Sequence, residues 1–331
     1  MEVNLNPLGS RPHRLETVAQ PTEHWGSLPY HQAWMINALA AMTETLTPPL
    51  SVEPIDWFAR WRDRVEAREA QNVRWQSPRM GDLGFWAMAA PRFARMTRNL
   101  PTTDPFVQAM RVRVQPDDVI LDIGAGAGRY SLPIAPWVKQ VIALDPSPEM
   151  LQQLQLIAAE QGIPNIQTLQ GSWPEALADL PPVDGVICAH AFYWVREMEP
   201  YLQALKTATG RFCLMQIRTH QIDAFLDPLF LRLHGESRPP EPVLLDLYGA
   251  LTQVGIWADV QIAKGSSRSY PEVEELTEFA IALLCWRPEL ASVLSREEIH
   301  TYLEGILEYR DGRYWLNDQA NQMAMVSWQK G

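Results

Sequence analysis

The run Val119–Gly128, VILDIGAGAG, combines an apolar stretch, an acidic residue and three glycines at every second position. Apolar residues that lead directly into a glycine-rich turn predict a buried parallel strand, followed by a helix. In such a turn, Gly124 allows a tight change of direction, Gly126 lets a ligand approach the backbone, and Gly128 permits close helix packing. The run therefore predicts a nucleotide-type cofactor site, with free backbone N–H groups at the start of the helix.

The spacing of the glycines distinguishes between cofactors. A dinucleotide fingerprint reads G-x-G-x-x-G, whereas this chain reads G-x-G-x-G, with Asp122 two residues before the first glycine. The next predicted strand, 140–145, ends at Asp145, and an acid there can bind the ribose hydroxyls of NAD or of S-adenosylmethionine (SAM) equally well. The glycine spacing, Asp122 and the continuation DPSPEML after the second strand favour SAM.

In these segments the chain resembles the class I SAM-dependent methyltransferases. The resemblance covers about residues 115–265 and is carried by 121–128, 141–151, 169–173 and 183–195. It implies a Rossmann-like fold: a doubly wound, mostly parallel seven-stranded sheet with SAM as cofactor and no metal. It also implies that the last strand is antiparallel and inserted between the fifth and the sixth.

The resemblance assigns roles to residues that follow the first three strands. Asp122 orients the amino-acid end of SAM, Asp145 binds the ribose, and Met150 packs on the adenine. Ser172 stands where many family members have an aspartate that accepts a hydrogen bond from the adenine amino group, so this contact is expected to be weaker. The predicted cofactor-binding set is Asp122, Gly124, Ala125, Gly126, Gly128, Asp145, Pro146, Met150, Gly171, Ser172, Trp173 and His190.

His190 and Tyr193 follow the fourth predicted strand, 184–189, and are expected to lie where the sulfonium methyl group points. Histidine titrates near neutral pH, so His190 is a candidate base for a hydroxyl or amine acceptor. The alternative is that His190 is a buried, hydrogen-bonded residue that positions the cofactor loop, because methyl transfer often needs only proximity and alignment. Both interpretations stay open at the level of sequence.

The periodicity of apolar residues predicts two additions to a SAM-binding domain at 113–331. Residues 1–112 form a helical extension, and about 268–312 form a helical insertion before the last strand. Trp86 and Phe93, in the extension, are candidates for a lid over SAM; the alternative is a helix that buries its aromatic side chains on the sheet. The predicted strands are 118–123, 140–145, 165–170, 184–189, 211–217, 257–262 and 323–328. The predicted helices are 31–46, 53–71, 83–97, 104–113, 128–138, 147–161, 173–179, 197–208, 244–254, 272–284 and 296–309.

Composition narrows the class of protein. The chain has 331 residues and a net charge of −11, so a nucleic-acid backbone is not an expected partner. No apolar run is long enough for a membrane span, the N-terminus lacks the features of a signal peptide, and three scattered cysteines suggest reduced thiols, so we expect a cytoplasmic protein. A homo-oligomer is possible but not indicated.

Charge is unevenly distributed along the chain: residues 60–113 carry an excess of positive charge and 271–310 an excess of negative charge. Solvated helix faces are the simplest explanation. The alternative is that the two additions contact each other, or that the first receives an acidic substrate.

The leading functional hypothesis is a methyltransferase that acts on a small molecule. The tryptophans of the helical additions suggest an enclosed pocket for an apolar or aromatic acceptor. A non-catalytic SAM-binding or regulatory protein on the same fold is an alternative, because fold does not guarantee activity. An NAD(P)-dependent oxidoreductase is less favoured, because the glycine spacing does not match its fingerprint.

Overall fold

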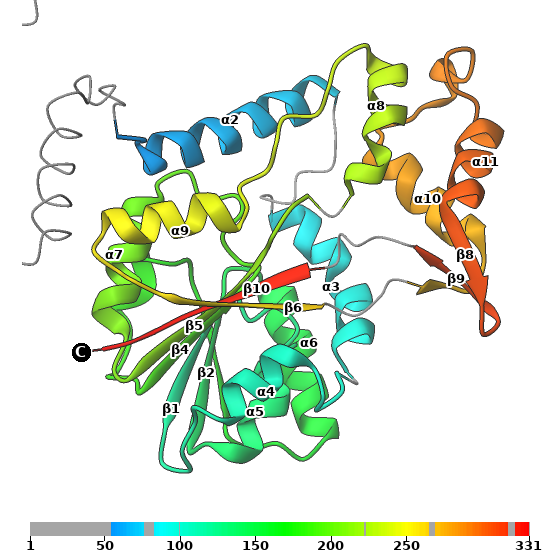
Figure 1. Ribbon diagram of the computed structural model, residues 1–331. Helices are drawn as coiled ribbons and strands as arrows, with labels where there is room; N and C mark the ends of the chain where they lie inside the picture. Colours follow the sequence, from blue (N-terminus) through cyan, green and yellow to red (C-terminus); the bar gives the residue numbers. More distant parts are fainter. Residues whose placement is uncertain are drawn as a thin grey trace, which may run out of the picture. The chain divides into compact units, whose positions relative to one another are not determined.

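Seven strands form one sheet in the computed structural model, in the order β3-β2-β1-β4-β5-β10-β6 (Figure 1). The first five strands along the chain pair in parallel, and β10 runs antiparallel between β5 and β6. The predicted doubly wound, mostly parallel seven-stranded sheet is therefore confirmed, including the place of its last strand. The strands are β1 Val119–Ile123, β2 Gln140–Asp145, β3 Ile166–Gln170, β4 Gly185–Ala189, β5 Phe212–Arg218, β6 Asp259–Lys264 and β10 Gln322–Gln329.

The structure describes residues 54–75, 83–98, 100–221, 223–264, 269–316 and 322–330, and Ile55–Gly331 belong to one compact unit. The predicted helix 31–46 lies outside the described residues. The helices of the N-terminal extension that lie within them are α2 Trp57–Trp75, α3 Leu83–Thr97 and α4 Pro105–Arg111. The domain boundary predicted near residue 112 stays a prediction.

Helices cover both faces of the sheet, which is why its central strands are apolar almost throughout. Alternate side chains of β1 point to opposite faces: Leu121 packs in one apolar cluster with α7 and α9, whereas Ile120 packs in another with α4. The β2 residue Ala143 belongs to a third cluster with α3 and α6. These helices are α6 Pro148–Glu160, α7 Met198–Ala208 and α9 Leu244–Gln253.

The helix after the glycine-rich loop is shorter than predicted. In place of one helix over 128–138, the chain forms α5 Ser131–Ile134 and a 3-10 turn, η1 Ala135–Trp137. Pro136 lacks the N–H that would continue the helix. The predicted helix 173–179 is likewise the 3-10 segment η2 Glu175–Asp179.

The insertion before β10 contains strands that the sequence analysis missed. α10 Val273–Leu283 and α11 Arg296–Ile306 pack with α8 Asp227–His234 around one apolar cluster. The helix predicted over 296–309 ends at Ile306, because a hairpin follows, with positive φ at both Asp311 and Gly312. An Asp-Gly pair is a strong signal for a two-residue hairpin turn. The small sheet, in the order β7-β9-β8, consists of β7 Ser269–Tyr270, β8 Leu307–Arg310 and β9 Arg313–Leu316.

Helix α2 docks on α9 through a glycine and a buried carboxylate. A Cβ atom on Gly249 would lie 2.0 Å from Cδ2 of Trp57, so only glycine allows this approach. The fully buried side chain of Asp246 accepts hydrogen bonds at 2.9 Å from both Arg60 and Arg64. The α2 helix is thereby fixed to the same body as the sheet.

We expect Gly249→Ala to destabilise the protein, because the new methyl group collides with Trp57. Overpacking of this kind typically costs about 1–3 kcal/mol. The matched control is Gly305→Ala in α11, where no atom lies within 4 Å of the added Cβ, and where alanine should stabilise the helix by about 0.5–1 kcal/mol. Urea unfolding of the two variants measures the difference; equal effects would contradict the α2–α9 contact.

Candidate functional site

The order of the strands places the candidate site between β1 and β4. The chain leaves β1 toward β2 on one side and leaves β4 toward β5 on the other, so the strand order reverses at this pair. In open α/β sheets, ligands bind at the carboxyl ends of the strands at such a switch point. The glycine-rich loop follows β1, and the loop with His190 and Tyr193 follows β4.

Two glycines let the backbone come close to its neighbours. Gly124 has a φ of +69°, and a Cβ atom there would lie 2.2 Å from the Cβ of Ala191 in the loop after β4. A Cβ on Gly128 would lie 2.2 Å from Cδ1 of Leu154 on α6. These contacts explain the tight turn and the close helix packing that the sequence predicts.

Gly126 differs from these two glycines, because the space above it is open. Its φ is +55°, and an added Cβ would meet only the sulfur of Met150, 4.0 Å away. This is the position where the sequence predicts close approach of a ligand. The N–H of Gly126 is not free, however: it donates to Oδ2 of Asp145 at 2.8 Å. With α5 only four residues long, the prediction of free N–H groups at a helix start is wrong for Gly126.

Asp145 ends β2 beside this loop, as predicted. One carboxylate oxygen accepts the Gly126 N–H, and the other accepts the N–H of Ser147 at 2.9 Å. Burial raises the pKa of Asp145, although both backbone hydrogen bonds oppose this shift. Each oxygen keeps a further lone pair, so the carboxylate can accept two ribose hydroxyls. Ser147 caps α6, because its hydroxyl accepts the N–H of Met150.

Asp122 is buried in β1 and is held by hydrogen bonds from the side chain and the backbone of Ser131. The hydroxyl of Ser131 donates to its Oδ2 at 2.6 Å. Burial raises the pKa of Asp122 to about 7, and the negative charge of Asp145 adds to the shift. The predicted role of Asp122 toward the amino-acid end of SAM stays a prediction.

The residues that are predicted to surround the adenine lie in three different environments. Met150 is buried in one cluster with Ala125 of the loop, and Trp86 and Phe93 of α3 pack against that cluster. Ser172 is exposed and Gly171 and Pro146 are partly exposed. Trp173 is 9% exposed, and its indole N–H donates to the carbonyl oxygen of Tyr201 at 3.2 Å, so most of its ring belongs to the core beside α7.

The α3 helix brings the two predicted lid residues to the loop. The rings of Trp86 and Phe93 meet edge to face, 5.4 Å apart. Ala90 and Ala94 of the same helix are buried in the cluster that contains Ala125 of the glycine-rich loop. Helix α3 therefore lies against both the loop and α6, an arrangement that is compatible with a lid and also with aromatic packing on the domain.

His190 is held in place by Tyr193. The residue has a φ of +59°, and its Nδ1 lies 2.8 Å from the Tyr193 hydroxyl. That hydroxyl accepts the backbone N–H of Arg218 at 3.0 Å, so its own proton points to Nδ1. Burial, together with the charges of Arg218 and Arg129, lowers the pKa of His190 to about 3. His190 is thus neutral at pH 7, with its proton on Nε2.

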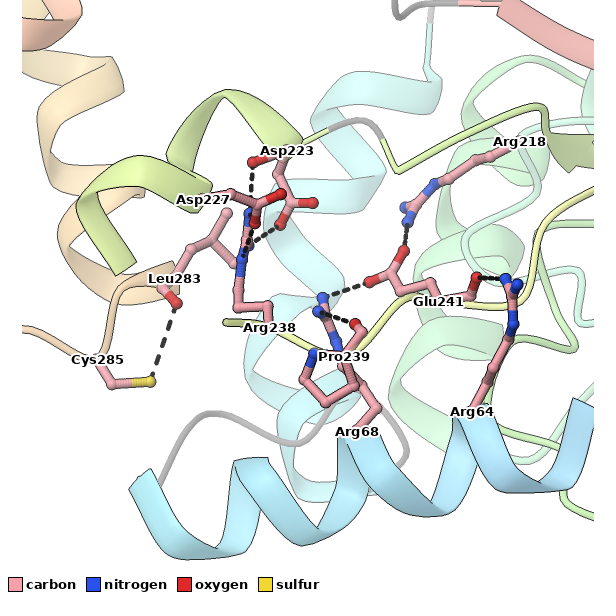
Figure 2. A network of polar contacts seen from close by, with 10 residues as sticks. All are labelled: Arg64, Arg68, Arg218, Asp223, Asp227, Arg238, Pro239, Glu241, Leu283 and Cys285. Atoms are coloured by element: carbon pink, nitrogen blue, oxygen red, sulfur yellow. Dashed lines mark hydrogen bonds and ion pairs between the residues drawn. The ribbon is translucent and has the colours of Figure 1, made fainter. Parts of the chain in front are cut away.

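An ion-pair network that the sequence analysis did not anticipate supports this arrangement (Figure 2). The guanidinium of Arg218 lies 4.8 Å from the centre of the Tyr193 ring and pairs with Glu241 at 3.0 Å. The other oxygen of Glu241 pairs with Arg68 of α2 at 2.6 Å. A cavity of about 20 Å³ between Arg68, Tyr193, Arg218 and Glu241 is large enough for one water molecule.

The arginine-rich α2 also has other partners. Arg62 pairs with Glu197, and Arg74 pairs with Glu236. These acids come from the loop before α7 and from the segment before α9. Among the described residues, none of these ion pairs joins α2 to an acid of 271–310. The two additions nevertheless meet: Arg287 donates to the carbonyl oxygen of Trp75 at 2.9 Å, and the guanidinium of Arg92 lies 5.8 Å from the centre of the Phe279 ring.

No group of three or more His, Cys, Asp and Glu side chains within the described residues could hold a metal ion. None of the helices described is both long enough and apolar enough to cross a membrane.

We expect the stability of an Asp122→Asn variant to depend on pH differently from that of the native protein. The unfolded chain loses the Asp122 proton near pH 4, whereas the folded protein keeps it up to about pH 7. The folded state binds more protons in this window, so Asp122 lowers the free energy of unfolding by about 1.4 kcal/mol per pH unit as pH rises.

The variant lacks this titration and should therefore gain stability relative to the native protein between pH 4 and pH 7. Urea unfolding without cofactor across this range measures the gain. Glu160→Gln, at the exposed end of α6, is the control. Parallel pH profiles for Asp122→Asn and the native protein would show that Asp122 titrates normally.

Comparison with known proteins adds a family match to this geometry. Residues 120–210 match the family model described as "Methyltransferase domain". An uncharacterized protein of Haemophilus influenzae is 27% identical over 207 residues, which cover 60% of this chain and 75% of that protein. The uncharacterized methyltransferase YcgJ of Bacillus subtilis is 32% identical over 99 residues, which cover 29% of this chain and 39% of YcgJ.

A probable cobalt-precorrin-6B C(15)-methyltransferase (decarboxylating) of Methanothermobacter thermautotrophicus is 33% identical over 69 residues, 20% of this chain and 36% of that protein. The chain thus spans less than two fifths of the length of these two named methyltransferases. Among solved structures, a putative methyltransferase from Bacillus halodurans has a TM-score of 0.45 and 15% identity, and covers 68% of this chain and 98% of its own. The matched residues, the strand order and the glycine-rich loop together identify the domain that contains residues 120–210 as a class I SAM-dependent methyltransferase domain.

Proposed function

We propose that this protein transfers the methyl group of SAM to a small apolar or aromatic acceptor. The observation that carries the proposal is the pairing of two features at the switch point. The backbone is open above Gly126, and the carboxylate of Asp145 lies against the N–H of that same residue. A ligand with a ribose can therefore reach backbone and carboxylate together.

The residues at this place fit SAM. Asp145 offers acceptors for the two ribose hydroxyls, and Met150 offers an apolar surface for the adenine. Asp122 lies below the loop, where its oxygen can face the amino-acid end. When bound, SAM supplies a methyl group on a sulfonium that carries its own leaving group.

The chain's contribution to the reaction is alignment and exclusion of water. His190 directly follows the carboxyl end of β4, and its ring is held by the hydrogen bond with Tyr193. Since Nε2 carries the proton of the neutral imidazole and Nδ1 accepts the Tyr193 hydroxyl, His190 is poorly suited to take a proton from the acceptor. We therefore assign His190 and Tyr193 to positioning, which was the alternative to a general base.

An apolar or aromatic acceptor is supported by aromatic side chains at the carboxyl ends of the strands. Trp86 and Phe93 pack against the cluster that contains Ala125 of the loop after β1. Phe192 and Tyr193 stack 5.6 Å apart in the loop after β4, and the Trp61 indole donates to Val195 in that loop. Trp86 and Phe93 are the partly buried rings of this set, whereas Trp61 and Phe192 are fully buried in the core cluster and support the loop after β4.

Ligand-dependent thermal unfolding tests the proposal against its alternatives. S-adenosylhomocysteine or SAM at about 100 times its Kd should raise the free energy of unfolding by about 2.7 kcal/mol, whereas NAD should have no effect. A shift with NAD alone would identify an oxidoreductase instead. Binding of SAM without turnover on a broad panel of small acceptors would identify the non-catalytic SAM-binding protein.

Asp145→Ala is expected to weaken binding of S-adenosylhomocysteine by about 10- to 100-fold, because the ribose hydroxyls lose a charged acceptor. Isothermal titration calorimetry measures the change. Asp179→Ala, an exposed acid in η2, is the control and should bind like the native protein. Unchanged affinity in a folded Asp145→Ala protein would remove this residue from the cofactor site.

A further inference from the structure

Arg129 lies at the switch point and has no carboxylate partner among the described residues. It follows Gly128 directly and is only partly exposed. Its Nε is buried without a hydrogen-bond partner, and no ion pair joins its guanidinium to another described residue. The guanidinium lies over the Tyr130 ring, 5.4 Å from its centre.

Other largely buried arginines near the carboxyl ends of the strands are paired with carboxylates. Arg68 and Arg218 share Glu241, and Arg238 pairs with both Asp223 and Asp227 (Figure 2). Within the described residues, Arg129 has no such carboxylate: its guanidinium contacts only the neutral Tyr130 side chain, and a charge that is partly removed from water without an opposite charge is costly. A ligand anion would compensate this cost at Arg129, as the carboxylates do at the other arginines.

The surroundings of Arg129 favour an anion at this place. Its charge acts on His190 across the switch point, and so does the charge of Arg218. Asp122, in the preceding strand β1, is bonded to Ser131 and is not paired with Arg129. The planar guanidinium matches a carboxylate, which it can bind through two parallel hydrogen bonds.

We propose that Arg129 binds a carboxylate group at the switch point, beside His190. The inference rests on the proposed function, which provides two sources for this group: the amino-acid end of SAM, and an acidic acceptor. The first would place the amino-acid end between Arg129 and Asp122. The second would make the acceptor an aromatic acid and not merely an apolar molecule.

Arg129→Gln distinguishes the two sources when it is tested with matched ligands. For the cofactor, we compare S-adenosylhomocysteine with 5′-methylthioadenosine, which shares the adenosine but lacks the amino-acid end. For the acceptor, we compare benzoate with benzamide, by thermal unfolding with and without S-adenosylhomocysteine. The control variant is Arg98→Gln, because Arg98 lies on the surface and pairs with Glu160.

If Arg129 binds the cofactor's carboxylate, Arg129→Gln loses about tenfold or more in affinity for S-adenosylhomocysteine and none for 5′-methylthioadenosine. If Arg129 binds the carboxylate of the acceptor, both adenosyl ligands bind normally to the variant. Benzoate then stabilises the native protein but not Arg129→Gln, and benzamide stabilises neither. Equal losses for both adenosyl ligands, or no difference from Arg98→Gln with any ligand, would overturn the proposal. Failure of the native protein to bind either adenosyl ligand would contradict the proposed function instead, and the benzoate comparison would then decide the role of Arg129.

Discussion

The contact between Gly124 and Ala191 is the constraint on which the site depends. The loops after β1 and β4 touch where a side chain on Gly124 would approach the Ala191 Cβ to 2.2 Å. Because the loops stay together at Gly124, they can part beyond it, with Gly126 on one side and His190 on the other. The left-handed backbone of His190, a conformation unusual for a residue other than glycine, lies next to this contact.

An ion-pair network outside the sheet fixes the position of Tyr193 in the loop after β4. Glu241 joins Arg68 of α2 to Arg218 at the end of β5, and Arg218 in turn holds the Tyr193 ring and hydroxyl. Buried ion pairs are weak evidence for stability, because desolvation offsets much of their attraction, but they can favour one arrangement over others. Helix α2 is therefore connected to the residue that orients His190, and the N-terminal extension takes part in shaping the site.

The parts of the structure that the sequence predicted are those that depend on local patterns. The buried strands, the glycine-rich turn and the acid that ends β2 follow from apolar runs and from spacing within about ten residues. Two differences from the prediction are also local: Pro136 ends the helical pattern after the loop, and the Asp311-Gly312 turn makes 307–310 a hairpin strand where the periodicity predicts a helix. What could not be predicted depends on tertiary contacts. The lowered pKa of His190 follows first from its burial and then from the charge of Arg218, which pairs with Glu241; these two residues are 28 and 51 positions further along the chain.

The charges around the switch point favour methyl transfer by alignment over proton transfer. A general base needs a pKa near the working pH, whereas burial and two nearby guanidinium groups lower the pKa of His190 to about 3. The buried carboxyl of Asp122, with a pKa of about 7, is bonded to Ser131 and lies on the β1 side. The two guanidinium groups come from both sides of the switch point, Arg129 from the loop after β1 and Arg218 from the end of β5, and would favour an acceptor that arrives already deprotonated. Such an acceptor needs no base, and the same positive charge that makes His190 a poor base would hold it in place.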